Sequence, residues 1–152
     1  MTGIPLWSTG LVSIDMTSTG PGAYNQQVID SFRANNGNLE NRPLLLLTTI
    51  GAKSGETRLN PLAYSRDGDR YVVLASKGGA PINPDWYHNL LAHPEVTVEV
   101  GGGQFKARAL VTRGAEYDRL FKAHTTALPN FAEYQDKTSR KIPVIVLEPL
   151  TQ

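Results

Sequence analysis

Short apolar runs and alternating segments along the chain predict β-strands. The segment 43–50 is an almost continuous apolar run, and 71–76 is similar, which is typical of strands buried on both faces. The segments 95–100 and 104–111 alternate polar and apolar residues, as half-buried strands do. Six segments are predicted to be strands: 43–50, 57–65, 71–76, 95–100, 104–111 and 142–147.

Apolar residues at helical spacing predict helices in the segments between these strands. Residues 23–34 carry an apolar stripe, and the asparagine-rich segment after them ends the helix. Asn83 is predicted to cap a second helix, with Pro84 at its first position. Further helices are predicted over 112–125 and, as a short piece, over 130–134.

The order of these elements is typical of an α+β fold. Three consecutive strands follow the first helix, and the Asp67-Gly68 pair predicts a hairpin turn between two of them. Hairpin-linked strands favour an antiparallel sheet, and six strands are enough to curl into a small barrel. Pro61 cannot donate to a strand ladder, so its strand is expected at a sheet edge or a bulge. We therefore predict one domain over 23–152, preceded by a flexible arm over 1–22.

Composition and charge limit the function classes. The 152 residues match the size of one domain, and cysteine is absent, which excludes disulfides and thiolate metal sites and fits a reducing compartment. The net charge of +1, from 15 basic and 14 acidic residues, argues against a nucleic-acid-binding protein. The histidines have no partners at metal-ligand spacing, so no metal is expected.

The N-terminal arm has no features of a targeting segment. It lacks a basic start and a continuous apolar core, and no apolar run in the chain approaches the roughly 20 residues that span a bilayer. A cytoplasmic protein is expected. Isolated apolar residues in the arm, including Trp7, leave open a peripheral contact with a membrane surface.

Two glycine-containing segments carry the residues best suited to chemistry. Lys53 and Ser54 lie in the loop after the first strand, Arg58 follows them, and Lys77 lies in the second segment. The stretch 53–77 contains five basic and three acidic residues. Glycines let backbone N–H groups approach an anion, and Lys and Arg supply charge. The pattern fits a site for the phosphate or carboxylate groups of a large ligand, and a solvated hairpin loop is the alternative interpretation.

Motifs spread over most of the chain carry a resemblance to a known family. They are Thr-Thr-Ile-Gly-Ala-Lys-Ser-Gly at 48–55, Arg-Leu-Asn-Pro-Leu at 58–62, Ala-Ser-Lys-Gly-Gly at 75–79, Asn-Pro at 83–84, Trp-Tyr at 86–87 with Asn89, and Ile-Pro-Val-Ile-Val at 142–146. In order and spacing they resemble the deazaflavin-dependent nitroreductase family. The resemblance implies a mostly antiparallel split β-barrel with flanking helices, related to FMN-binding reductases. It also implies coenzyme F420, a polyglutamylated 8-hydroxy-5-deazaflavin, in place of FMN.

The same resemblance implies which residues form the site. The phosphate and polyglutamate tail of the cofactor would be held by Lys53, Ser54, Gly55 and Arg58, with added charge from Lys77. The deazaflavin ring would be lined by Pro61, Ala75, Ser76, Lys77, Gly78, Asp85, Trp86, Tyr87, His88 and Asn89. The substrate pocket would be lined by Leu128, Phe131 and Tyr134.

Some positions depart from the family pattern. Ala52 stands where many members have a second basic residue, and Ala63 stands where a tyrosine is frequent. Leu128 and Phe131 replace tyrosines of the substrate pocket, whereas Tyr134 remains. We therefore expect weaker tail binding, and the activation of nitroimidazoles does not carry over.

The function implied is hydride transfer from reduced F420 to a small electron-poor acceptor, such as a quinone, a conjugated enone or lactone, or a nitroaromatic. Tyr134 or Ser76 would supply or relay the proton, with solvent as the alternative. An FMN-dependent oxidoreductase of the same barrel type, or a non-catalytic deazaflavin carrier or lipid-associated binding module, stays open, as do monomer and homodimer. Lys137, Arg140 and Lys141 are interpreted as a solvated basic face.

Overall fold

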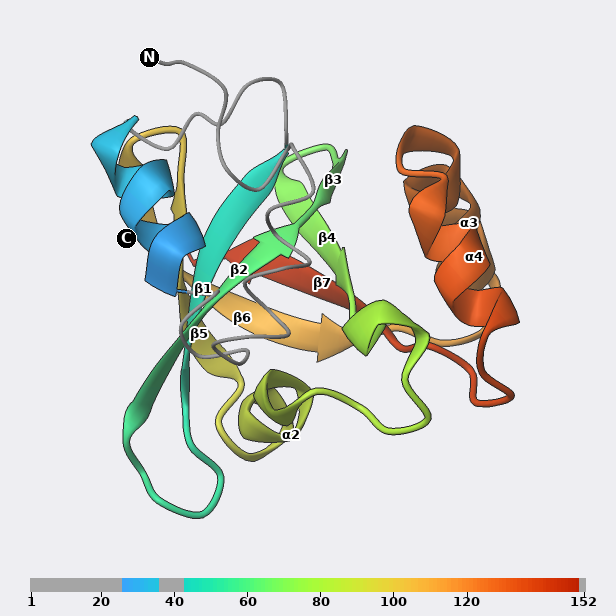
Figure 1. Cartoon of the computed structure of the whole chain (residues 1–152), viewed down its shortest axis with the longest axis horizontal. Helices are drawn as coiled ribbons and strands as arrows, with labels where there is room; N and C mark the ends of the chain where they lie inside the picture. The colour runs from blue at the N-terminus through green and yellow to red at the C-terminus, as the bar shows by residue number, and fades with distance from the viewer. Residues whose placement is uncertain (1–25, 36–42, 151–152) are drawn as a thin grey trace.

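Seven strands form one antiparallel sheet in the computed structural model, which describes residues 26–35 and 43–150. The strands lie in the order β2-β1-β5-β6-β7-β4-β3, and the sheet curls into a half-barrel (Figure 1). Their bounds are β1 Leu44–Ile50, β2 Thr57–Ala63, β3 Ser65–Asp67, β4 Arg70–Leu74, β5 Glu95–Val100, β6 Gly103–Val111 and β7 Val144–Pro149. The predicted α+β class with a curled antiparallel sheet is confirmed.

One predicted strand is two strands in the structure. Residues 57–65 divide at Tyr64 into β2, which pairs with β1, and β3, which pairs with β4 at the other end of the sheet order. The prediction of six strands is therefore one short, because no glycine or asparagine near Tyr64 marks the change of partner. Pro61 of β2 lies opposite Leu46 of β1, and β2 is an edge strand, as predicted.

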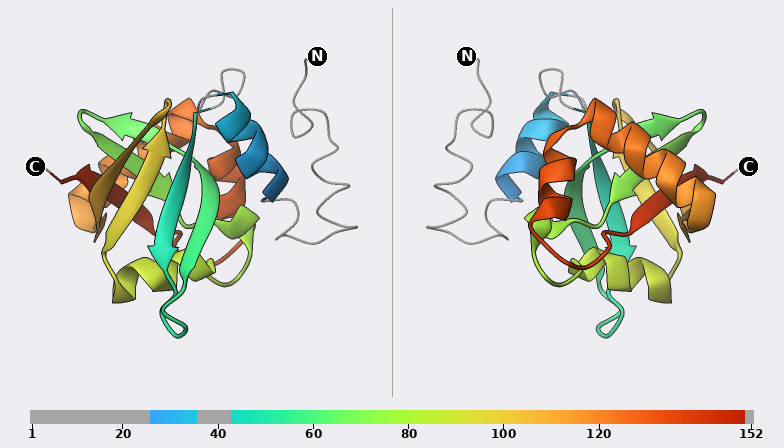
Figure 2. Two further views of the ribbon diagram at one scale, coloured as in Figure 1. Left: turned by 90° about the vertical axis from the view of Figure 1, so that its left-hand side faces the viewer. Right: turned by 90° about the vertical axis from the view of Figure 1, so that its right-hand side faces the viewer.

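The interior of the half-barrel is filled by apolar side chains from the strands and from helix α2 (Asp85–Ala92). Leu45 and Leu47 of β1 point inward and are fully buried. Trp86 and Leu90 of α2 pack against the same cluster and are 5% and 1% exposed. Helix α2 thus lies across the lower end of the sheet in Figure 2 and presents its other face to solvent.

Helices also cover the outer face of the sheet. The helical residues 26–34 pack Val28, Ile29 and Phe32 against Leu46 of β1. The helices α3 (Gly114–Ala127) and α4 (Asn130–Asp136) lie on the other side in Figure 1 and pack against β4 and β7. A short 3₁₀ turn, η2 (Lys77–Gly79), connects the end of β4 to the segment before α2.

Helix starts differ from the predicted ones by one or two residues. Helix α2 begins at Asp85 with Pro84 as its N-cap, because the Asn83 side chain accepts a hydrogen bond from Arg140 at 2.7 Å instead of capping the helix. Helix α3 begins at Gly114, since Thr112 gives both its N–H and its hydroxyl to the Val144 carbonyl.

Some expectations fall outside the described residues. The predicted arm over 1–22 and the first three residues of the predicted helix 23–34 are among them. Within 26–35 and 43–150, no helix is both long and apolar enough to cross a membrane.

Candidate functional site

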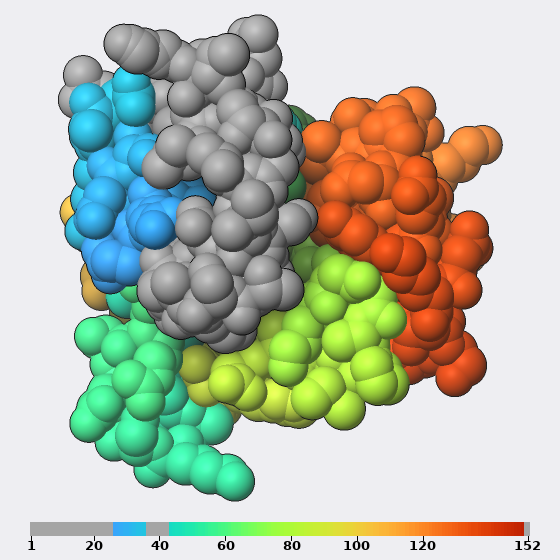
Figure 3. Space-filling model, viewed as in Figure 1, coloured from blue at the N-terminus to red at the C-terminus, as the bar shows by residue number. Residues whose placement is uncertain are grey.

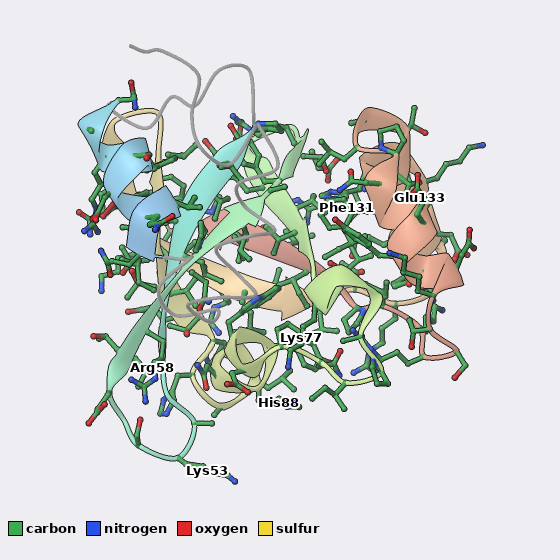
Figure 4. The ribbon with its side chains drawn as sticks, viewed as in Figure 1. Lys53, Arg58, Lys77, His88, Phe131 and Glu133 are labelled. Atoms are coloured by element: carbon green, nitrogen blue, oxygen red, sulfur yellow. The ribbon has the colours of Figure 1, made fainter. Side chains whose placement is uncertain are left out.

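A cleft of about 700 Å³ lies between the β1–β2 loop, the start of β2 and helix α2. The surfaces of the loop and of α2 face each other at the lower part of the molecule (Figure 3). Figure 4 shows Lys53 at the tip of the loop and Arg58 where the loop becomes strand, with His88 on the helix. The lining residues are Gly51, Ala52, Lys53, Ser54, Arg58, Leu59, Asn60, Asp85, His88 and Asn89.

The loop that carries Lys53 and Ser54 is a tight turn. Gly51 donates to the Glu56 carbonyl at 2.7 Å, and Gly55, at φ +75°, donates to the Gly51 carbonyl at 2.9 Å. A Cβ on Gly51 would lie 2.5 Å from Ser54 Oγ and 3.3 Å from the Glu56 carbonyl oxygen, so a larger residue here would displace the Ser54 hydroxyl. Ser54 Oγ accepts from the Glu56 N–H at 3.1 Å, which leaves the hydroxyl proton of Ser54 available to a ligand.

Asn89 fastens the loop to helix α2. Its side-chain oxygen accepts from the Ala52 N–H at 2.9 Å, and its side-chain nitrogen donates to Thr49 Oγ1 at 3.1 Å. Both Asn89 and Thr49 are buried. One amide side chain therefore joins the cationic loop and the end of β1 to the helix.

The cleft has an uneven charge distribution. Lys53 and Arg58 carry positive charge on the loop side, and Asp85 carries negative charge on the helix side. The nearest anion to Arg58 is Glu56, at 3.3 Å in an exposed pair. Exposed pairs of this kind contribute at most about 1 kcal/mol. An anionic group that enters the cleft can therefore replace Glu56 as the partner of Arg58 at a small cost in free energy.

Helix α2 divides its predicted ligand residues between two faces. Asp85, His88 and Asn89 line the cleft. Trp86 packs into the interior of the half-barrel, and Tyr87 is partly buried against the same cluster. The two aromatic side chains therefore support the helix from beneath, as buried aromatic residues at helical spacing usually do.

The segment from Ala75 to Gly79 lies apart from the cleft. Lys77 is exposed, but it is not among the residues that line the cleft with Lys53 and Arg58. Lys77 lies instead on the η2 turn after β4, and this turn contacts helix α4. Ala75 is fully buried and Ser76 is 6% exposed. Of the five residues predicted to hold the anionic tail, Lys53, Ser54 and Arg58 line the cleft. Gly55 belongs to the same loop but is not among the lining residues, and Lys77 belongs to a second region.

The predicted substrate residues lie on and before α4, next to that second region. Phe131 is buried among side chains of α3, β4 and β7, and Leu128 and Tyr134 pack at its border. Tyr134 Oη accepts from Asn130 Nδ2 at 3.1 Å, which leaves the phenol proton of Tyr134 free to donate. Figure 4 shows Phe131 on α4, on the opposite side of the sheet from Arg58.

Helix α4 touches the η2 turn directly. A Cβ on Gly79, which has φ +88°, would lie 2.9 Å from the Tyr134 carbonyl oxygen and 2.9 Å from Lys137 Cβ. Gly79 is therefore required by the close approach of α4. The contact brings the predicted substrate residues beside the turn that carries Lys77.

Sequence analysis misses several residues of these two regions. Gly51, Ala52, Leu59 and Asn60 line the cleft but are absent from the prediction. Asn60 has a detectable signal, since it is a polar residue two positions after Arg58, on the same face of an edge strand. Arg140 is interpreted as part of a solvated basic face, and this interpretation is wrong, because its guanidinium makes four hydrogen bonds to protein groups.

One titratable side chain stands out by its burial. His124 of α3 is fully buried, and its Nδ1 is hydrogen-bonded to Ser65 Oγ at 2.7 Å. Burial lowers the pKa of His124 from 6.5 to about 4. Its Nε2 has no partner among the described residues. Within the described part of the chain, no three His, Asp or Glu side chains are grouped so as to hold a metal ion.

Comparison with known proteins agrees with the sequence resemblance. The family described as F420H(2)-dependent quinone reductase matches residues 24–149. An F420H(2)-dependent quinone reductase of Mycobacterium tuberculosis is 43% identical over 124 residues, which cover 76% of this chain and 83% of the relative.

Solved structures extend this likeness to the fold. A structure described as an F420-H2 dependent reductase, FDR-A, is 42% identical, with a TM-score of 0.66 over 70% of this chain and 95% of the other. A structure described as a domain-swapped dimer is 36% identical, with a TM-score of 0.68 over 84% of this chain and 96% of the other.

Proposed function

The chain belongs to the F420H(2)-dependent quinone reductase family, and on that premise we propose that it passes a hydride from reduced F420 to a small electron-poor acceptor. F420H2-dependent reduction follows from the family. The acceptor class is our proposal: a quinone first, and then a conjugated enone or lactone, or a nitroaromatic.

The observation that carries the proposal is the cleft between the cationic loop and α2. It brings Lys53, Ser54 and Arg58 to one wall, and its volume of about 700 Å³ suits a large ligand. The polyglutamate and phosphate groups of F420 are anions, and two cations with a free hydroxyl are a donor set that fits them. Charge-assisted hydrogen bonds of this kind contribute roughly 1.5–3 kcal/mol each. Several of them would be enough for micromolar binding.

The proposed ring site is the region between this cleft and helix α4. We assign its walls to Pro61, to Ser76 and Lys77, and to the cleft face of α2 with Asp85 and His88. Trp86 and Tyr87 would act from beneath by fixing the helix, and Asn89 by fixing the loop. Ala75, Gly78 and Gly55 would contribute backbone, which lets a flat ring or an anionic chain come close.

The protein's part in the reaction is orientation and exclusion of water. Reduced F420, when bound, supplies a hydride from a ring carbon. Leu128 would offer an apolar surface to a flat acceptor, and Phe131, which is buried, would support that surface from beneath. Ser76 and Tyr134 are the candidates for proton delivery, because Tyr134 accepts from Asn130 and keeps its own proton for donation. Solvent is the alternative proton source.

The experiment that tests the proposed function is a side-by-side titration. The purified chain is mixed with oxidised F420, FMN and NADPH, and binding is followed by fluorescence. The proposal expects saturable binding of F420 in the micromolar range and much weaker binding of the other two. Tight FMN binding would point to the flavin-dependent alternative.

Turnover separates an enzyme from a carrier. With F420H2 as donor and menadione as a quinone probe, the proposal expects F420H2 oxidation that depends on protein concentration. Tight F420 binding with no oxidation by a quinone, an enone or a nitroaromatic would support the carrier alternative and contradict the reductase.

A further inference from the structure

Arg140 connects three parts of the chain through one guanidinium group. It lies in the linker between α4 and β7. Its Nη2 donates to the carbonyl oxygens of Ala75 at 3.1 Å and of Ser76 at 2.9 Å. Its Nε donates to the Ala80 carbonyl at 2.9 Å, and its Nη1 donates to Asn83 Oδ1 at 2.7 Å.

These four acceptors bracket the η2 turn. Ala75 and Ser76 come directly before Lys77–Gly79, and Ala80 comes directly after it. Asn83 is the last residue but one before α2 begins. Arg140 therefore binds the residues before the turn, the residue after it and the segment that leads into α2. It does so with one planar guanidinium, whose geometry lysine cannot reproduce.

The turn needs such a hold because its backbone is strained. Lys77 has φ +48°, and it is the one side-chain-bearing residue with positive φ in the described part of the chain. Gly78 and Gly79 follow at φ +65° and +88°. A non-glycine residue persists in this conformation only when its surroundings over-determine it. The contacts of Arg140 on both sides of Lys77 supply that constraint.

Arg140 is itself fixed from α4. The Gln135 side chain donates to the Arg140 carbonyl at 2.7 Å and accepts from the Ile142 N–H at 3.0 Å. Thr138 Oγ1 accepts from the Arg140 N–H at 3.3 Å. The backbone of Arg140 is thus held on the same helix that carries Tyr134, so the turn and the predicted substrate residues share one support.

Arg140 also differs from the paired arginines of this protein. The arginines paired with a carboxylate are Arg33, Arg58, Arg70 and Arg119. Within the described ranges, no carboxylate lies within 4.0 Å of Arg140, and burial lowers its pKa. Four of the five guanidinium N–H groups donate to oxygen atoms of the protein, so one at most is left for a ligand. The chemistry of this side chain is that of a support, not of an anion-binding residue.

We propose that Arg140 is a positioning residue, which holds the Lys77–Gly79 turn and the start of α2 in the arrangement that receives the cofactor ring. This inference rests on the proposed function for its ligand. It goes beyond that function, because Arg140 touches neither the cleft nor the predicted acceptor residues and acts through Ser76, Lys77 and the helix.

The test compares Arg140→Ala and Arg140→Lys with wild type in the full chain. The first measurement needs no ligand: limited trypsin digestion, with mass spectrometry of cleavage after Lys77 relative to cleavage after Lys53. Both lysines are exposed. Of the two loops that carry them, Arg140 is hydrogen-bonded to the one around Lys77. Cleavage after Lys77 should rise at least about fivefold in Arg140→Ala, and cleavage after Lys53 should stay unchanged.

The second measurement is the dissociation constant for oxidised F420, with kcat/KM for F420H2 and menadione. Arg140→Ala should weaken binding at least about tenfold. Arg140→Lys keeps the charge but loses the planar fork, so it should resemble Arg140→Ala more than wild type. Because Arg140→Lys is the milder change, it keeps the test valid if Arg140→Ala fails to fold.

Tyr117→Phe is the matched control. It removes the hydrogen bond from Tyr117 Oη to the Ile142 carbonyl at 2.6 Å, in the same linker, and leaves the turn untouched. It should lower Tm without a change in Lys77 cleavage or F420 affinity. The inference is overturned if Arg140→Lys behaves as wild type, or if Tyr117→Phe reproduces the effects at equal loss of Tm. A wild-type chain that does not bind F420 overturns the proposed function alone, since the trypsin measurement reads the hold on the turn without ligand.

Discussion

Asn89 illustrates how a single amide can organise a binding cleft. It satisfies the Ala52 N–H on the loop and the Thr49 hydroxyl on β1 from a buried position on α2. The family resemblance assigns Asn89 to cofactor binding. Its contacts indicate that it acts at least in part by holding the loop, which would make its effect on affinity indirect.

Replacement of Asn89 by Ala should therefore affect both stability and binding. The change leaves two polar groups without partners, so the free energy of unfolding should fall by roughly 1–3 kcal/mol. F420 affinity should fall as well, because the loop with Lys53 is no longer tied to the helix. Urea unfolding and fluorescence titration measure the two effects, with His93→Ala, on the exposed end of the same helix, as the control. Unchanged stability in Asn89→Ala would show that the hydrogen bonds of Asn89 to Ala52 and Thr49 are absent in solution.

Tyr134 offers a second test at this scale. If it delivers a proton or orients the acceptor, Tyr134→Phe should lower kcat with menadione by several-fold and leave the F420 dissociation constant within twofold of wild type. The ring stays in place, so packing against Phe131 is kept. Stopped-flow turnover and titration separate the two quantities. A loss of affinity with unchanged kcat would mean that Tyr134 belongs to the cofactor site.

The junction of α3 with β3 contains a buried histidine that makes stability depend on pH. His124 is neutral in the folded protein because burial lowers its pKa to about 4, whereas an unfolded histidine titrates near 6.5. Above pH 6.5 both states are neutral and the stability is fully present. As the pH falls from 6.5 to 4, the unfolded state takes up a proton that the folded state resists, so stability falls. Below pH 4 the histidine is protonated in both states, so this contribution is fully lost and the stability no longer changes with its titration.

The expected loss across this window is on the order of 3 kcal/mol. It should appear as a decline in the free energy of unfolding between pH 6.5 and 4, measured by urea denaturation. His124→Gln should flatten the decline, whereas His93→Gln, at an exposed position, should leave it intact. A decline of equal size in His124→Gln would assign the pH dependence to other groups.

Elements that are defined by local pattern are well predicted, and those defined by distant partners are not. The alternation in 95–100 and 104–111 is enough to place β5 and β6 nearly to the residue. Tyr64 is different, because it changes the strand from partner β1 to partner β4, and neither partner is encoded nearby. The start of α2 is misplaced for the same reason, since Asn83 is bound by Arg140, 57 residues away.

At the scale of the whole molecule, the curled sheet decides which candidate residues meet. Lys53 and Arg58 are neighbours in sequence, and the hairpin between β1 and β2 brings them to one cleft. Lys77 follows β4 on the η2 turn, which contacts α4 and is not among the residues that line the cleft. Sequence spacing could not separate the two regions. The contacts of Arg140 could not be predicted either, because a cluster with Lys137 and Lys141 looks the same in sequence whether its arginine faces solvent or bonds to backbone carbonyl groups.

Two whole-molecule properties remain predictions. The first is the oligomeric state, monomer or homodimer. One similar structure is described as a domain-swapped dimer, and that description concerns the other protein. A membrane contact through residues 1–22 concerns a segment outside the described residues.

The most direct test of the account is the affinity of the Lys53→Ala, Arg58→Ala double variant for F420. The control is Arg113→Ala with Lys122→Ala, which removes the same charge from exposed positions on the α3 side. The double variant should bind oxidised F420 at least about tenfold more weakly than wild type, with unchanged Tm and a smaller dependence of affinity on salt. The control should bind as wild type does. A double variant with wild-type affinity would contradict the claim that this cleft receives the anionic tail of the cofactor.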